Sequence, residues 1–199
     1  MVGVSKTKLT TKVVGVLALQ GAFNSHARVL GRLNVATQEV RTPQDLASVD
    51  ALVMPGGEST TMSQLLESSE LFEPIKKMIH EGMPVFGTCA GMILLAKKIV
   101  DGRDDQVSFG AIDIQVQRNA YGRQVDSFEA EIEVEGFDAP FHAVFIRAPR
   151  IVKIAQDVEV LAEYGADIVL AKQKNVLVAS FHPELSPDQR IHEMFIKEI

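Results

Sequence analysis

The sequence predicts an α/β fold: a mostly parallel central sheet with helices on both faces, and a β-rich insertion in the second half. Three runs of almost entirely apolar residues, 13–19, 51–54 and 176–181, carry this prediction. Such runs are typical of strands buried on both faces of a parallel sheet, whereas half-exposed strands alternate polar and apolar residues. Strands and helical patterns alternate in the first half, which indicates a doubly wound sheet.

The expected elements can be placed along the chain in order. In the first half we expect strands at 13–19, 36–40, 51–54 and 85–87, and helices at 23–33, 59–66, 71–80 and 90–98. In the second half, strand-like segments follow one another without long helices between them, at 112–118, 127–134, 141–146, 159–164, 168–172 and 176–181. A last helix is expected at 188–199, because Ile191, Phe195 and Ile196 share one helical face.

Length and composition limit the classes of protein that fit this chain. Its 199 residues suit one domain over 13–199, after a polar leader at 1–12 that we expect to be disordered. The net charge of −6 argues against a nucleic-acid surface, and no apolar run approaches the roughly 20 residues that span a bilayer. A single cysteine cannot form an internal disulfide, which indicates a reducing compartment such as the cytoplasm. No cysteine and histidine set has metal-ligand spacing, so we expect no metal.

The segment 83–95 is predicted to form a strand, a tight turn and a helix around the single cysteine. Gly87 and Gly91 flank Cys89 with the spacing of a nucleophile elbow, G-x-S-x-G, in which Cys replaces Ser. The N-terminus of the following helix favours an anion, and therefore a thiolate. Cys89 is the candidate nucleophile.

A cysteine nucleophile needs a base, and His182 is the favoured candidate. It follows the predicted strand 176–181, and the carboxyl ends of parallel strands meet at one edge of a sheet, where Cys89 also lies. Pro183 should keep the chain extended, so that His182 and Glu184 point to the same side and Glu184 orients the imidazole. The alternative is a surface histidine beside a solvated glutamate. His26, His80 and His192 fall in predicted helices, where a solvated or partly buried role is the default.

The loop at 55–60 also follows a strand. Its paired glycines, Gly56 and Gly57, allow close approach of the backbone to a ligand, and an N–H group there, with that of Ala90, would form an oxyanion hole. The alternative is a plain strand-to-helix turn capped by Ser59 or Thr60. Arg118 and Arg147 lie near the ends of inserted strands and suit a substrate carboxylate, although an exposed arginine is the simpler interpretation of each one alone.

Three motifs together resemble those of the class I, or triad, glutamine amidotransferases: Gly-Thr-Cys-Ala-Gly at 87–91, His-Pro-Glu at 182–184 and Pro-Gly-Gly-Glu-Ser-Thr-Thr at 55–61. The segments 16–23, 118–128 and 145–149 are similar to those of one subfamily, the glutaminase subunits of pyridoxal 5′-phosphate synthase. The resemblance extends from about residue 13 to the C-terminus. It implies a three-layer, flavodoxin-like fold.

The resemblance also implies roles for individual residues. Cys89 would attack the side-chain amide of L-glutamine, His182 would transfer protons, Glu184 would orient His182, and water would release L-glutamate from a γ-glutamyl thioester. The implied oxyanion hole consists of Gly57 and Ala90, and docking of a partner would complete it. The implied glutamine-binding positions are Gly57, Glu58, Ser59, Arg118, Ile146 and Arg147. The ammonia would pass to a separate (β/α)8-barrel synthase subunit in a hetero-oligomer, and the chain itself would need no cofactor.

Two other interpretations remain open at this point. A DJ-1-like or PfpI-like cysteine hydrolase or redox sensor also has an α/β fold with a cysteine elbow, but it leaves the motifs at 182–184 and 56–59 unexplained. A non-catalytic module would be expected to have lost Cys89 or His182.

Overall fold

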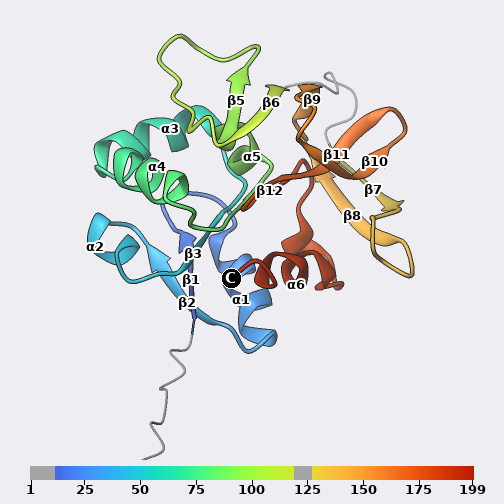
Figure 1. Cartoon of the computed structure of the whole chain (residues 1–199), viewed down its shortest axis with the longest axis horizontal. Helices are drawn as coiled ribbons and strands as arrows, with labels where there is room; N and C mark the ends of the chain where they lie inside the picture. Colours follow the sequence, from blue (N-terminus) through green and yellow to red (C-terminus); the bar gives the residue numbers. More distant parts are fainter. Residues whose placement is uncertain (1–11, 119–126) are drawn as a thin grey trace, which may run out of the picture.

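The computed structural model describes residues 12–118 and 127–199, and a seven-stranded sheet lies at its centre in the order β10-β11-β12-β4-β3-β1-β2 (Figure 1). Five neighbouring strands are parallel: β1 (Val13–Leu17), β2 (Ala36–Val40), β3 (Ala51–Met54), β4 (Val85–Thr88) and β12 (Val176–Ala179). β11 (Asp167–Gln173) and β10 (Glu159–Tyr164) add an antiparallel edge. The predicted mostly parallel sheet is confirmed. The expected leader up to residue 11, and residues 119–126 of the segment 118–128, lie outside the described residues.

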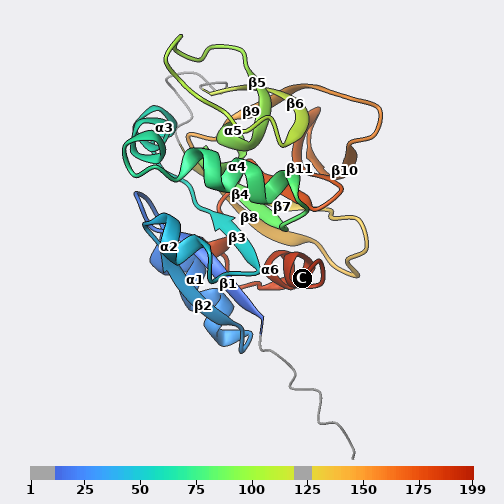
Figure 2. The ribbon, with the colours of Figure 1, turned by 60° about the vertical axis from the view of Figure 1, so that its left-hand side comes forward.

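Helices cover both faces of this sheet (Figures 1 and 2). One face carries α1 (Phe23–Arg32) and α6 (Arg190–Ile196), and the other carries α2 (Pro43–Leu46), α3 (Ser59–Ser68), α4 (Phe72–His80) and α5 (Ala90–Leu95). Successive strand residues feed two separate cores, because side chains alternate across a sheet. In β3, Leu52 and Met54 join the core under α3 and α4, while Ala51 and Val53 join the core under α1 and α6.

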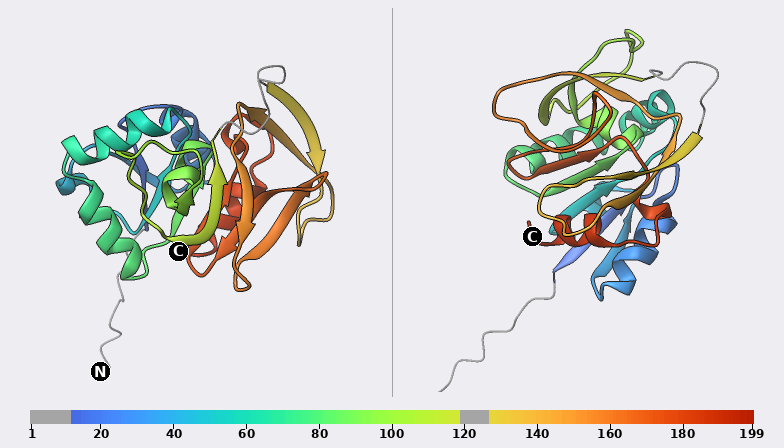
Figure 3. Two further views of the ribbon diagram at one scale, coloured as in Figure 1. Left: turned by 90° about the horizontal axis from the view of Figure 1, so that it is seen from above. Right: turned by 90° about the vertical axis from the view of Figure 1, so that its right-hand side faces the viewer.

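The second half adds two small sheets. A three-stranded sheet consists of β5 (Ala96–Ile99), β6 (Ile112–Gln117) and β9 (Arg150–Ile154). A hairpin consists of β7 (Ser127–Ile132) and β8 (Phe141–Ile146), and in the left view of Figure 3 the yellow β7 lies across the molecule from the green α3 and α4. These strands form the expected β-rich second half. Among the described residues, no helix is long and apolar enough to cross a membrane.

Several predicted boundaries are wrong. The helix expected at 90–98 ends at Leu95, because residues 96–99 pair with β6 as the parallel strand β5. β9 and α2 were not expected; α2 begins at a capping box, in which the side chains of Thr42 and Asp45 satisfy each other's backbone N–H groups. The last helix begins at Arg190 instead of residue 188.

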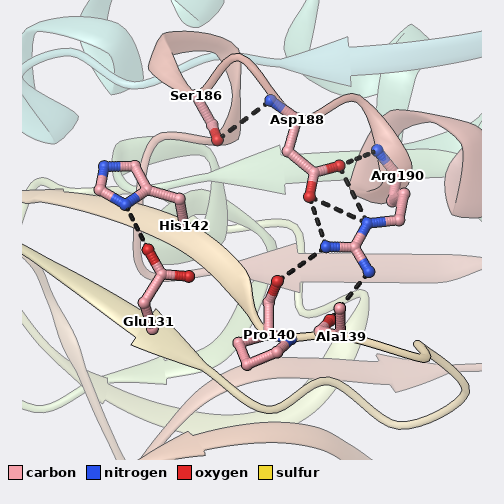
Figure 4. Close-up of polar contacts among 7 residues, drawn as sticks. All are labelled: Glu131, Ala139, Pro140, His142, Ser186, Asp188 and Arg190. Atoms are coloured by element: carbon pink, nitrogen blue, oxygen red, sulfur yellow. Dashed lines mark hydrogen bonds and ion pairs between the residues drawn. The ribbon is translucent and has the colours of Figure 1, made fainter.

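An arginine connects the start of α6 to the hairpin (Figure 4). Arg190 donates hydrogen bonds to the carbonyl oxygens of Ala139 and Pro140, each at 2.8 Å, and its Nε donates to the carboxylate of Asp188 at 2.9 Å. Close by in the same view, His142 of β8 pairs with Glu131 of β7 at 2.7 Å. The charged fork of Arg190 therefore sets the position of α6 relative to β8.

Candidate active site

Cys89 lies at a strained turn between β4 and α5. Its φ of 49° and ψ of −105° place a non-glycine residue in a region that side chains rarely adopt, as expected for a nucleophile elbow. Its backbone N–H donates to the carbonyl oxygen of Ala179 in β12 at 2.8 Å. A Cβ at Gly91 would lie 2.0 Å from the carbonyl oxygen of Met54, so only glycine lets α5 pack this close to β3.

The structure brings Cys89, His182 and Glu184 together. His182 follows β12 and hydrogen-bonds with Cys89 through its side chain. On its other side, His182 Nδ1 lies 2.7 Å from Glu184 Oε1. The side chain of Glu184 is 0% exposed and that of His182 is 10% exposed, so the imidazole reaches the surface and its acidic partner does not.

The extended backbone that the sequence analysis expected between His182 and Glu184 is wrong. Pro183 does not keep the chain extended; it begins a 3-10 turn, η1 (Pro183–Leu185). The two side chains still meet, because the turn brings Glu184 Oε1 within 2.7 Å of His182 Nδ1. The backbone N–H of His182 donates to the carbonyl oxygen of Val144 at 2.8 Å, which holds the start of this turn against β8.

The electrostatics of the trio favour a charged imidazole. Burial alone would lower the pKa of His182, but its hydrogen bonds with Cys89 and Glu184, and the negative charge of both groups, raise that pKa to about 10. Burial would raise the pKa of Glu184, yet the neighbouring His26 and His182 hold it below its usual range. The arrangement therefore favours an imidazolium at His182, backed by the Glu184 carboxylate and placed beside Cys89.

A cavity of about 300 Å³ opens beside Cys89. Eight of the predicted site residues line it: Cys89, His182, Gly57, Glu58, Ser59, Arg118, Ile146 and Arg147. Two predicted residues do not. Glu184 lies behind His182, and Ala90 is buried as the first residue of α5, directly after the cysteine.

The loop between β3 and α3 is fixed by Glu58, which caps α3; the alternative interpretation of this loop placed the cap at Ser59 or Thr60. Its carboxylate accepts hydrogen bonds from the N–H groups of Thr60 at 3.0 Å and Thr61 at 2.7 Å. Burial would raise the pKa of Glu58, but these bonds lower it to about 2. Both carboxylate oxygens accept hydrogen bonds from the start of α3, so Glu58 lines the cavity as a charged group whose role is to hold this helix.

Arg118 crosses from β6 to the same loop. Its Nη1 donates to Thr60 Oγ1 and to Gln106 Oε1, both at 2.7 Å. Its buried Nε has no hydrogen-bond partner among the described residues. Arg118 also lines the cavity, and a guanidinium in that place can bind a carboxylate.

Comparison with known proteins decides the family. The model of the SNO glutamine amidotransferase family matches residues 16–199. The chain belongs to this family. It is 55% identical to the pyridoxal 5′-phosphate synthase subunit PdxT of Thermosipho africanus, over 94% of this chain and 98% of that one. It is 53% identical to the PdxT of Desulforamulus reducens, over 94% and 99%.

Solved structures agree with this assignment. A crystal structure of a glutamine amidotransferase, 47% identical, superposes with a TM-score of 0.88 over 93% of this chain and 97% of that one. A putative GMP synthase subunit from Thermoplasma acidophilum, 17% identical, has a TM-score of 0.68 over 96% and 95%, which shows the shared fold alone. The predicted amidotransferase fold and family are confirmed, and a DJ-1-like or PfpI-like protein is not favoured.

Two residues near the active site of this amidotransferase were missed by the sequence analysis. His26 in α1 and His192 in α6 are both 0% exposed, and His26 Nε2 lies 3.3 Å from Glu184 Oε2. The default expectation of a solvated or partly buried role is wrong for both. The signal for His26 was its spacing, because it shares a helical face with buried Val29 and Leu30.

No metal site is apparent in the part of the chain that the structure describes. There, no group of three or more histidine, cysteine, aspartate and glutamate side chains is arranged to hold an ion.

Proposed function

We propose that this chain hydrolyses L-glutamine to L-glutamate and ammonia, and delivers the ammonia to a pyridoxal 5′-phosphate synthase. One observation carries the proposal: a cysteine on a strained elbow, a histidine and a buried glutamate form one hydrogen-bonded series at the wall of a cavity. That series suits acyl transfer from an amide. Membership in the amidotransferase family supports glutamine as the amide.

In the proposed reaction, the Cys89 thiolate attacks the side-chain amide carbon of glutamine, and the C–S bond forms as the carbonyl π electrons move to oxygen. His182, as an imidazolium, gives its proton to the amide nitrogen, and the C–N bond breaks to release ammonia. The neutral imidazole then takes a proton from water, which attacks the γ-glutamyl thioester. The carbonyl re-forms as the C–S bond breaks, which releases glutamate and regenerates the thiolate and the imidazolium. Glu184 holds the imidazole ring in place throughout and stabilises it whenever it is charged.

The cavity supports roles for the remaining predicted residues. Arg118 and Arg147 place positive charge opposite the carboxylate of a bound glutamine, and Gly57, Ser59 and Ile146 shape the wall around it. The backbone N–H groups of Gly57 and Ala90 serve as the proposed oxyanion hole.

The proposed partner is a (β/α)8-barrel synthase subunit. The curated relatives are named as subunits of pyridoxal 5′-phosphate synthase, which supports assembly with a synthase. Docking over the cavity would keep ammonia from water. Leu185, a 47% exposed apolar side chain one residue after Glu184, is a candidate contact for the synthase. A reducing compartment, the cytoplasm, suits a free cysteine nucleophile.

The decisive experiment measures glutamate release from glutamine, with and without the synthase partner. We expect release that the synthase increases, and a loss of at least about a thousandfold in Cys89→Ala and His182→Asn. His80→Asn, which changes an exposed histidine at the end of α4, is the matched control and should keep wild-type activity. Absence of release by the wild-type chain under both conditions would overturn the proposal.

A further inference from the structure

Two buried histidines form a second layer behind the proposed triad. His26 of α1 and His192 of α6 meet on one face of the sheet, with His26 Nδ1 3.0 Å from His192 Nε2. The other nitrogen of His26, Nε2, lies 3.2 Å from Thr88 Oγ1 and 3.3 Å from Glu184 Oε2. Elements from both ends of the chain therefore converge on the carboxylate that orients His182.

Glu184 has one satisfied oxygen and one unsatisfied oxygen. Oε1 faces His182 Nδ1 at 2.7 Å, whereas Oε2 has no hydrogen-bond partner among the described residues, although the side chain is 0% exposed. A buried carboxylate oxygen without a donor is costly. His26 Nε2 lies within donor distance of it, and a small rotation of the ring turns its N–H from Thr88 Oγ1 toward Glu184 Oε2.

The surroundings select the tautomer of His26. Burial lowers the pKa of His26 and lowers that of His192 to about 3, so both rings are neutral when the protein is folded. If His26 carried its hydrogen on Nδ1, its Nε2 lone pair would face a carboxylate, and His192 would keep a buried N–H on Nδ1, an atom with no partner among the described residues. A hydrogen on Nε2 of both rings avoids both problems, because His192 then donates to His26 and His26 faces Glu184 with its N–H.

We propose that His26 is a positioning residue of the active site, which donates its Nε2–H to Glu184 Oε2, and that His192 fixes the tautomer in which it can do so. This inference rests on the proposed glutaminase function. Glu184 is then held between two imidazoles, one on each oxygen, and can neither rotate away from His182 nor lose its charge easily. His26 acts on the reaction through Glu184 and touches no substrate.

The hydrogen bond from His26 to Glu184 should affect the pH dependence of the reaction. The titratable groups that face Glu184 are His182 and His26; those that face His26 are Glu184, His182 and His192. Without the His26 N–H, burial is less opposed, so the pKa of Glu184 rises. The acid limb of the kcat/KM profile, where protonation of Glu184 abolishes the orientation of His182, should therefore move to higher pH.

The experiment compares His26→Leu with His26→Gln in the complex with the synthase. Leu removes the donor, whereas the Gln amide places an N–H near the position of Nε2. We expect His26→Leu to lower kcat by about tenfold or more with KM for glutamine nearly unchanged, and to move the acid limb upward, while His26→Gln stays close to wild type. Phe195→Leu is the control, because Phe195 packs on Phe86 in the same core and contributes no polar group. It should lower Tm and leave the acid limb in place.

Wild-type kcat with an unmoved acid limb in His26→Leu would overturn the inference. Equal losses of kcat in His26→Leu and His26→Gln, in proportion to the fall in Tm, would overturn it as well. A second measurement does not need activity or a folded Leu variant. In ¹⁵N-histidine spectra of the wild-type chain, His26 should carry its hydrogen on Nε2, and that signal should shift in Glu184→Gln. A hydrogen on Nδ1 would overturn the inference even if glutamine is hydrolysed. Absence of glutaminase activity with the Nε2–H signal intact would overturn the proposed function instead.

Discussion

Gly56 packs against both members of the thiol–imidazole pair. A Cβ at this position would lie 2.5 Å from His182 Cε1 and 3.3 Å from Cys89 Cβ. The first distance is shorter than side chains tolerate, and an imidazole ring cannot bend aside as the end of a flexible chain can. The geometry of the active site therefore depends on the absence of one methyl group.

We expect Gly56→Ala to lower kcat by about tenfold or more, because His182 must leave its place between Cys89 and Glu184. The measurement is glutamate release in the synthase complex, with the free energy of unfolding from urea titration. Gly31→Ala in α1 is the control, since a Cβ there meets nothing within 4 Å. It should keep wild-type kcat and stabilise the chain by about 0.5–1 kcal/mol. Full activity in Gly56→Ala would contradict the packing described here.

Residues of the candidate site differ in how far the sequence predicts them. Cys89 and His182 follow directly from strand ends and motif spacing, because the chemistry of acyl transfer needs these types at one sheet edge. The backbone conformation at Pro183 could not be predicted from the sequence, because a proline fits both an extended segment and the first position of a helical turn. His26 and His192 were missed because the partners of His26 are far away along the chain: Glu184 is 158 residues and His192 is 166 residues away, and only tertiary packing brings them together.

Strands were predicted best where they are short, fully buried apolar segments. β1, β3 and β12 are short apolar runs, and the structure has a strand at each. Alanine and lysine favour a helix at 96–99, but pairing with β6 outweighs that weak local preference. β9 pairs with β6 although the whole β7–β8 hairpin lies between them in the sequence. Its β-branched residues Ile151, Val152 and Ile154 were a local strand signal that the sequence analysis missed.

The joint between α6 and the β7–β8 hairpin makes a prediction of its own. Arg190→Ala removes the donors to the carbonyls of Ala139 and Pro140 and should lower the free energy of unfolding by about 1–2 kcal/mol. Urea titration measures this change. Arg28→Ala is the control, because Arg28 is exposed and its Nε donates to the carbonyl oxygen of Asn24 in its own helix, α1. An unfolding midpoint equal to that of the control would show that the hydrogen bonds of Arg190 contribute nothing to the free energy of unfolding.

The molecule as a whole carries two neutral imidazoles where its two outer helices meet the sheet. Burial lowers the pKa of both His26 and His192, the latter to about 3, whereas both titrate near 6.5 in the unfolded chain. Between the folded and the unfolded pKa values of these histidines, the unfolded chain binds more protons than the folded chain. The free energy of unfolding therefore falls as the pH falls below about 6.5, with a limit of about 1.4 kcal/mol per pH unit for each histidine.

The test compares the wild-type chain with His192→Gln between pH 6 and pH 4.5. His182, whose pKa is raised to about 10, is charged in both the folded and the unfolded chain at the low end of this range, so it adds little to the slope there. Glu184, whose pKa is lowered, begins to lose its stabilising contribution only below its unfolded pKa near 4.5. The wild-type free energy of unfolding should fall steeply with acid, and the variant should fall less steeply by about one proton. Urea titrations at each pH measure both slopes. Parallel slopes would mean that His192 accepts a proton without unfolding, and that the two helices can part enough to let water reach the carboxylate behind the active site.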